Sequence, residues 1–285
     1  MADEGNQLNL WICGNKLAQC FDVSKPAEPA ELLWEWDSAA AADLSAEQRE
    51  WFCSMDEIKP VLWQNTPCLL CTASWRGGVV LIRRKDRAVL FAAAISEAHS
   101  ADLLPDGRLI VAGAKETHRL YLFHIEDGPF PGSARAELEL QDAHGVVFDA
   151  SRGEIWATGT DQLVRVACED RSMRIVHRVT LPEAGAHDLS PHPRDGSLIL
   201  TTATRAWRFD PRTDAIAPFE PLAAIPKLKS ISIHPRTGLV AFQKGEAGNW
   251  WSDTAYILSP DGCLQTCVLP GRRLYKVRWD RLHQL

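Results

Sequence analysis

Residues 99–114 read HSADLLPDGRLIVAGA, which is a short apolar strand, a PDG turn and a second strand ending in small residues. The same pattern returns at residues 59–74 (KPVLWQNTPCLLCTAS), 144–159 (HGVVFDASRGEIWATG), 187–202 (HDLSPHPRDGSLILTT) and 229–244 (KSISIHPRTGLVAFQK). The turns PDG, SRG, RDG and RTG have the composition of β-hairpin turns. A strand-turn-strand repeat of about forty residues is typical of the blades of a β-propeller.

Each repeat continues with a third strand that closes on an acidic turn, such as LYLFHIED at 120–127, and a weaker fourth strand. The segment KVRWD at 276–280 resembles an innermost strand with nothing after it, whereas LNLWICG at 8–14 and LAQCFDVSKP at 17–26 resemble second and third strands. A blade shared between the two ends would leave no free sheet edge. We therefore expect one all-β domain over residues 1–285, a six-bladed propeller with blades starting near 59, 99, 144, 187, 229 and 276, the last completed by residues 8–36.

One stretch breaks the β pattern, DSAAAADLSAEQREWFCSM at 37–55. Ser45 and Gln48 have the spacing of a capping box in front of an amphipathic run. This predicts a short helix near 43–54. Because it precedes the first full blade, we expect it over the upper face of the propeller, beside the channel.

The composition is that of an ordinary globular chain, with 46% apolar residues and a formal charge of -6. That charge argues against a general nucleic-acid or membrane surface. MADEGNQLNL at the N-terminus lacks the basic and apolar regions of a signal peptide, so we expect a cytoplasmic protein. The eight cysteines are expected to be free and mostly buried. Cys68 and Cys71 lie in a strand, where a spacing of three points side chains to opposite faces, and this favours a packing role over a redox or zinc site.

Alignment of the repeats on their turns gives one equivalent position at the start of each innermost strand. The residues there are Lys59, His99, His144, His187, Lys229 and Lys276. We expect these six side chains to ring one end of the channel, with the histidines on one half and the lysines on the other. The register is least certain at the first blade, where Glu57 or Ile58 could take the place of Lys59.

A single histidine in a strand is usually a packed imidazole bonded to the backbone, but three at one repeat position favour a functional role. Neutral imidazoles converging from neighbouring strands could hold a divalent ion such as zinc, iron, manganese or nickel. Lys59, Lys229 and Lys276 would repel one another unless an anion lay between them. Such crowding lowers the pKa of a lysine and suits it to act as a base. We expect a small anionic ligand, and the sequence contains no nucleotide-cofactor motif.

Loops between second and third strands should emerge at the same end and line the pocket. Their candidate substrate-binding residues are Arg76, Glu116, His118, Arg205, Trp250, Trp251 and Asp253. The tryptophan pair lies on a glycine-bounded loop, a setting in which aromatic rings stack on flat or sugar-like ligands. The alternative is that one of the two tryptophans caps the blade core.

The whole pattern of repeats resembles bacterial six-bladed propellers of uncharacterised function. The histidine cluster is similar in type to the manganese site of oligogalacturonate lyases, in which basic side chains hold a uronate carboxylate. That likeness implies His99, His144 and His187 as metal ligands, with Lys59, Lys229 and Lys276 on the substrate side. Those enzymes have seven blades, and this chain shows no clear fourth ligand, so the likeness is one of site type.

These observations lead to three functional hypotheses. The first is a metal-assisted lyase, epimerase or isomerase acting on a small anionic substrate such as a sugar acid. The second is a propeller that binds a ligand or a protein and does no chemistry. The third is a lactonase-like hydrolase, for which Glu57 is the one suitable carboxylate near the expected ring.

Overall fold

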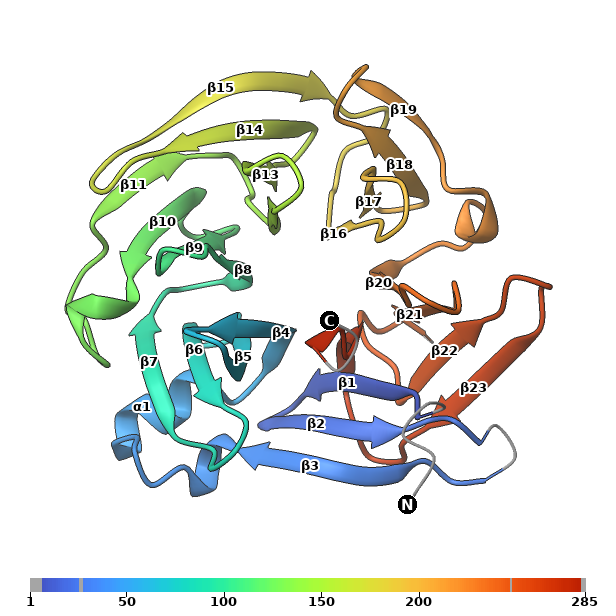
Figure 1. Cartoon of the computed structure of the whole chain (residues 1–285), viewed down its shortest axis with the longest axis horizontal. Coiled ribbons are helices and arrows are strands. Elements are labelled where there is room, and N and C mark those ends of the chain that lie inside the picture. The colour runs from blue at the N-terminus through green and yellow to red at the C-terminus, as the bar shows by residue number, and fades with distance from the viewer. Residues whose placement is uncertain (1–6, 26–27, 247, 283–285) are drawn as a thin grey trace.

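The computed structural model of the chain describes residues 7–25, 28–246 and 248–282. Over these residues it forms six four-stranded antiparallel sheets arranged around a central axis (Figure 1). Residues 1–6, the first part of the segment MADEGNQLNL on which the expectation about a signal peptide rests, lie outside the described residues. No helix in the described part of the chain is long and apolar enough to cross a membrane.

Five sheets are continuous along the chain. They are β4 (Met55–Trp63), β5 (Thr66–Ala73), β6 (Gly78–Arg83) and β7 (Val89–Ala94); β8 (Ala98–Leu103), β9 (Arg108–Gly113), β10 (Arg119–His124) and β11 (Ala136–Glu139); β12 (Gly145–Asp149), β13 (Glu154–Thr158), β14 (Gln162–Cys168) and β15 (Met173–Thr180); β16 (Asp188–Pro191), β17 (Leu198–Thr201), β18 (Ala206–Asp210) and β19 (Ala215–Pro218); β20 (Leu228–Ile233), β21 (Val240–Lys244), β22 (Thr254–Leu258) and β23 (Leu264–Val268). The first strand of each lies nearest the axis (Figure 1).

The sixth sheet joins the two ends of the chain. Its strands are β24 (Leu274–Trp279), β1 (Asn9–Gly14), β2 (Leu17–Asp22) and β3 (Glu31–Asp37), in that order across the sheet. Antiparallel pairing of β24 with β1 sets Lys276 opposite Cys13 and Trp279 opposite Leu10. The expected six blades and the shared last blade are therefore confirmed.

Burial of apolar side chains between neighbouring sheets holds the ring together. Six hydrophobic clusters fill the six spaces between blades, and each draws residues from two adjacent sheets. Cys68 and Cys71 belong to different clusters, because residues three apart on β5 face opposite sides of the sheet. All eight cysteines are free, and five of them are buried.

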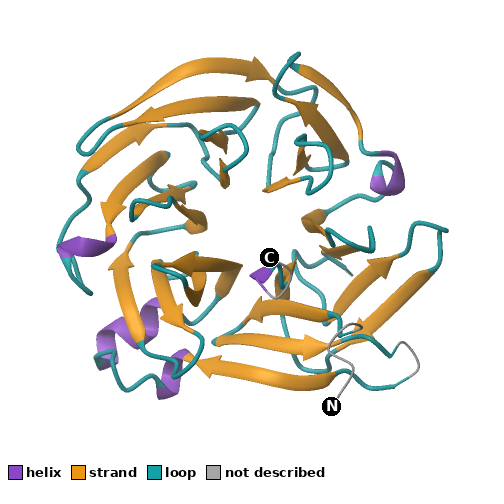
Figure 2. Ribbon diagram, in the orientation of Figure 1, coloured by secondary structure: helices purple, strands orange, loops and turns teal. Residues whose placement is uncertain are grey.

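The predicted helix is present as α1 (Ala46–Trp51), and it is the one α-helix among the described residues. Figure 2 draws it in purple together with the short 3-10 segments. The Ser45 hydroxyl accepts from the Gln48 N–H at 3.2 Å, and the Gln48 side chain accepts from the Ser45 N–H at 2.8 Å. Its expected place over the upper face, beside the channel, is wrong. The helix lies at the outer rim beside β7, because the adjoining Phe52 is fully buried in the cluster between the last and first blades.

Candidate functional site

A cavity of about 270 Å³ opens at the end of the axis where the innermost strands begin. It is lined by Asp56, Ser74, Glu97, His99, Lys115, Asp142, His144, His187, Lys229, Trp250 and Tyr275. The three histidines and Lys229 of the expected ring thus lie together around one hollow.

The backbone at the start of each innermost strand aims these side chains inward. Pairing shifts register between Ala98 and Ser100, and between Leu228 and Ser230, so that His99 and Lys229 are the extra residues of two β-bulges. Two residues before the ring position the chain enters the left-handed region, at Glu97 (φ 55) and Lys227 (φ 59). The equivalent residues of the two intervening blades, Asp142 (φ 51) and Gly185 (φ 82), do the same. Non-glycine residues adopt this conformation at a cost of about 1 kcal/mol or more. Its recurrence in four blades shows that the fold sets the backbone geometry at this end of the channel, which we call the mouth.

The first blade departs from the expected ring. Its bulge falls between Met55 and Glu57, so Asp56 takes the position assigned to Lys59. The cause is the length of β4, which has nine residues where β8 has six, with a tight turn at Gln64 and Asn65. The number of residues between the turn and the mouth is therefore three larger in β4 than in β8, so a count based on the other blades arrives at Lys59 and not at Asp56. Lys59 lines a different cavity, at the opposite end of the axis.

The last blade also departs from the expected ring. Tyr275 lines the mouth, and Lys276, the next residue along β24, is buried beneath the cavity. The Lys276 side chain is 0% exposed, and its ammonium donates to Glu57 Oε2 at 3.1 Å and to the His99 carbonyl at 3.1 Å. Asp188 Oδ1 lies 3.4 Å away. The expectation that Lys276 faces the mouth is thus wrong, and its surroundings make it part of a buried ion-pair network.

Arg278 completes this network, which we call the plug: Glu57, Asp188, Lys276 and Arg278. The Arg278 guanidinium donates to Asp188 at 2.6 and 3.1 Å and to Glu57 at 3.0 Å. Burial acts to raise the pKa of Glu57, but Arg278 and Lys276 outweigh it and hold that pKa well below its usual range. Two carboxylates face two cations, so the plug is neutral and separates the two ends of the channel.

The three histidines lie in a row, in which His99 and His144 stack and His187 meets His144 edge-on. The rings of His99 and His144 are 4.3 Å apart and 24° from parallel, and His187 meets His144 edge-on at 5.2 Å. At one end of the row His99 Nε2 contacts Glu97 at 3.2 Å, and at the other His187 Nε2 lies 3.0 Å from the Lys229 ammonium nitrogen. The row of imidazoles is therefore held by ring contacts within it and by one polar contact at each end.

These contacts determine where each imidazole carries its proton. An ammonium can only donate, so His187 Nε2 is the acceptor and the ring proton lies on Nδ1. A carboxylate can only accept, so His99 donates from Nε2 and its Nδ1 carries a lone pair. His144 Nδ1 lies 3.1 Å from the Asp142 carbonyl and is therefore its protonated nitrogen.

Burial sets the charge of the mouth. It lowers the pKa of His99 and of His144 to about 3 and that of His187 to about 2, so all three imidazoles are neutral at pH 7. Burial also lowers the pKa of Lys229 to about 8, with further lowering by Lys115 and Lys227. In the opposite direction, burial raises the pKa of Asp56 to about 7, although Ser74 and Lys276 oppose it. The pKa values of Lys229 and Asp56 therefore both lie near neutral pH.

The imidazole arrangement does not fit the expected metal site. The nearly parallel rings of His99 and His144 direct their nitrogen lone pairs side by side, whereas ligands of one ion must converge on it. His187 Nε2 is already occupied by the Lys229 ammonium. Within the described ranges, no group of three or more His, Cys, Asp or Glu side chains could hold a metal ion.

Of the seven loop residues predicted to contact a ligand, Trp250 lies in the cavity wall, edge-on to Tyr275 at 5.3 Å. Trp251 lies instead beneath the Arg273 guanidinium at 5.1 Å. The remaining residues are engaged elsewhere: Arg76 with Glu50, Glu116 with Ser96, His118 with the Asp142 N–H, Arg205 in a separate surface hollow and Asp253 with Thr254.

Sequence reasoning missed the acidic half of the mouth, although a signal for it exists. Glu97 and Asp142 each stand two residues before a ring histidine, in the triplets EAH and DAH. Lys115 lines the cavity and directly precedes Glu116, the residue of that loop which the sequence indicates. No sequence pattern indicates Asp56 or Tyr275, because β-bulges in strand pairing determine that their side chains face the cavity.

A family model described as "Family of unknown function (DUF6528)" matches residues 17–282. The chain belongs to this family. No curated protein sequence matches the DUF6528 chain significantly.

Solved structures resemble the DUF6528 chain in fold at low sequence identity. A chain of the nidogen/laminin complex superposes with a TM-score of 0.61 at 11% identity, covering 96% of this chain and 98% of that one. A putative 6-phosphogluconolactonase from Bacteroides uniformis gives 0.54 at 12% identity, with 92% and 82% covered. Hydrazine synthase from Kuenenia stuttgartiensis gives 0.53 at 13% identity and covers 73% of this chain, which spans only 64% of that chain. Such different proteins share the fold alone.

Proposed function

We propose that the chain is an enzyme that binds a small polyhydroxy acid, or the corresponding lactone, in the cavity at the mouth and moves a proton on it. Lys229 and Asp56 are the two proton-exchanging groups. Epimerase, isomerase and lyase chemistry all begin with such a proton transfer.

The observation that carries the proposal is a concentration of unpartnered polar atoms. Twelve buried side-chain nitrogen and oxygen atoms of the described residues lack a hydrogen-bond partner, and five of them belong to residues lining this cavity. They are both carboxylate oxygens of Asp56, Nδ1 of His99, Oδ1 of Asp142 and Nδ1 of His187. Two of them face each other beyond hydrogen-bond distance, with His99 Nδ1 3.7 Å from Asp56 Oδ2, and Ser74 lies close enough to Asp56 to lower its pKa. Buried polar atoms are rarely left unpaired, so this concentration indicates a polar ligand.

The mixture of donors and acceptors indicates the class of ligand. Lys115, Lys229 and the Nδ1–H of His187 can donate to a carboxylate, while Glu97 and Asp142 can accept from hydroxyl groups. Trp250 supplies an aromatic face of the kind that stacks on sugar rings. A polyhydroxy acid offers all three features at once, and a cavity of about 270 Å³ limits it to a small one.

Lys229 and Asp56 have the pKa values that proton exchange near neutrality requires. In the proposed step the free amine of Lys229 takes the proton of a substrate C–H bond, and the bonding electrons pass into the adjacent carboxyl or lactone group. Asp56 in its neutral form then gives a proton to the carbon, and exchange with water resets both groups. Lys229 and Asp56 lie in the blades on either side of the one that carries Tyr275, so they would contact one substrate from two sides.

A divalent metal, which the sequence led us to expect, has no step in this proposal because the imidazoles do not converge. Metal analysis of the purified protein tests this separately from the proton transfer.

The test is a calorimetric binding screen with aldonates, uronates and their lactones, followed by solvent-deuterium exchange on any ligand found. At pH 7, where Lys229 is mostly an ammonium, Lys229→Met should weaken binding about 10- to 100-fold, since a charged hydrogen bond contributes about 1.5–3 kcal/mol, and it should abolish exchange because the base is lost. The matched control is Lys25→Met, at a lysine whose side chain is 71% exposed. Exchange in the wild type should rise with pH around 8. Equal ligand binding by both variants, or binding without exchange, would overturn the assignment and favour a propeller that only binds.

A further inference from the structure

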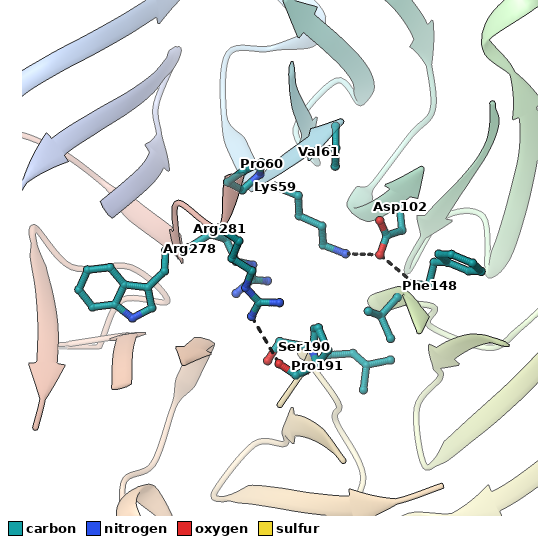
Figure 3. Close-up of a pocket in the computed structure, with 12 residues that line it drawn as sticks. Lys59, Pro60, Val61, Asp102, Phe148, Ser190, Pro191, Arg278 and Arg281 are labelled. Carbon is teal, nitrogen blue, oxygen red and sulfur yellow. Dashed lines mark hydrogen bonds and ion pairs between the residues drawn. The ribbon is translucent and has the colours of Figure 1, made fainter. Parts of the chain in front are cut away.

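A second cavity, of about 170 Å³, lies at the opposite end of the axis below the plug. The charged residues in its wall are Lys59, Asp102, Arg278 and Arg281, and Phe148 and Pro191 are among its apolar residues. Figure 3 shows the Lys59 and Arg281 side chains both extending into this space, from β4 and from the residues after β24.

The cations of this cavity are not fully neutralised. The Lys59 ammonium lies 3.5 Å from Asp102 Oδ2 and donates to the Val146 carbonyl at 2.6 Å. Asp102 Oδ2 also accepts from the Phe148 N–H at 2.9 Å, so its negative charge is shared. Arg278 is balanced within the plug.

Arg281 is the cation left over. Its guanidinium donates to the Pro191 carbonyl at 3.4 Å, and no carboxylate of the described residues lies within 4.0 Å of it. Counting the plug with this cavity, three carboxylates face four cations. Burial lowers the pKa of Arg281 to about 10, and Arg278 lowers it further while Asp102 opposes the shift. Arg281 therefore stays charged at neutral pH in a partly buried place, with no counterion among the residues that the structure describes.

We propose that this cavity binds a small oxyanion, a carboxylate or a phosphate, held by Arg281 with Lys59 beside it. A planar guanidinium presents paired N–H groups that match two oxygens of one anion. A cavity of roughly 150 Å³ accepts a molecule the size of benzene, so this one accepts phosphate or a short carboxylic acid and excludes a polyhydroxy acid of sugar size. The site is independent of the function proposed for the mouth, because the plug lies between them.

The test measures thermal unfolding of the full chain against increasing inorganic phosphate and, separately, malonate, with sodium chloride at matched ionic strength as the reference. We expect the melting temperature to rise with at least one of the two anions beyond the chloride reference. Phosphate alone, malonate alone or both would each support the oxyanion site and would identify the source. Stabilisation no greater than that by chloride with both anions would overturn it.

Variants locate the effect. Arg281→Gln should weaken the anion affinity at least tenfold and should fold normally, because it removes an unneutralised charge. The control Arg171→Gln, at an arginine whose side chain is 77% exposed, should respond as the wild type does. Arg281→Lys keeps the charge but loses the paired N–H groups and should fall between the two. An unchanged response in Arg281→Gln, or a response lost in Lys229→Met at the other mouth, would refute this location.

Discussion

Replacing Lys276 by methionine tests whether this lysine holds the propeller together. We expect Lys276→Met to lower the free energy of unfolding by about 3–5 kcal/mol, the range found when one partner of a buried ion pair is removed. Methionine keeps the length and the apolar stem of the side chain, so the change is mainly in charge and hydrogen bonding.

The magnitude follows from the partners that the ammonium leaves behind. Without it, Glu57 and Asp188 are both buried and must share the single guanidinium of Arg278, which leaves one uncompensated negative charge. The His99 carbonyl loses its donor as well. With an unfolding entropy of about 2.1 cal/mol/K per residue, 285 residues give roughly 0.6 kcal/mol/K, so the melting temperature should fall by about 5–8 °C.

Urea unfolding followed by circular dichroism measures the change, with Lys25→Met as the matched control. Lys25 forms an exposed pair with Glu28, and its loss should alter stability by no more than about 0.5 kcal/mol. The double variant Glu57→Gln/Lys276→Met restores charge balance and should be at least about 1 kcal/mol more stable than Lys276→Met. If Lys276→Met unfolds within 1 kcal/mol of the control, or if the double variant is the less stable, the ion-pair reasoning is refuted.

Three further predictions concern the mouth and one turn. The pKa of Asp56 is raised to about 7 from 3.8, so its ionisation destabilises the fold as pH rises between these values; Asp56→Asn should be more stable than the wild type at pH 8, by at most about 4 kcal/mol, and equal to it below pH 4 in urea unfolding. The pKa of His187 is lowered to about 2 from 6.5, so the wild type loses stability as pH falls below 6.5; His187→Gln should lose about 2 kcal/mol less between pH 7 and pH 5 by the same assay. A Cβ at Gly107 (φ 93) would lie 2.6 Å from the Trp63 ring, so Gly107→Ala should cost about 1–2 kcal/mol more than Gly128→Ala (φ 101), whose Cβ meets open space; equal melting temperatures would contradict this.

The fold could be predicted because a propeller repeats its own turn chemistry. Turns such as PDG and RTG mark the hairpin of a blade without reference to any other blade, and five copies with matching ends fix the number at six. The position of α1 could not be predicted in this way. A capping box specifies that a helix begins at Ala46 but not which surface Phe52 will bury.

The residues of the mouth could be predicted only in blades whose first strand has the same number of residues before the hairpin turn. His99, His144, His187 and Lys229 follow the same count from their turns, and the structure brings them together. β4 is three residues longer than β8, and β24 pairs with β1 from the other end of the chain instead of with a following strand. Counting from the turns therefore places Lys59 and Lys276 at the mouth, where the structure does not have them. Bulges, which are set by pairing between strands, leave no local sequence mark of comparable strength.

The closing strand β24 connects the stability of the ring to the chemistry of its channel. Tyr275 lies in the wall of the mouth, Lys276 belongs to the plug and Arg278 reaches the lower cavity, so one strand contributes to all three levels. Lys276 also acts on the mouth from below, because its positive charge adds to the burial that keeps His99 and His187 neutral and lowers the pKa of Lys229. Lys276, which the sequence predicts in the ring, therefore acts on the mouth through its charge and through its hydrogen bond to the His99 carbonyl. A mouth with neutral imidazoles and a lysine that can lose its proton near pH 8 exists only once β24 has paired with β1, so the proposed activity should appear together with closure of the propeller.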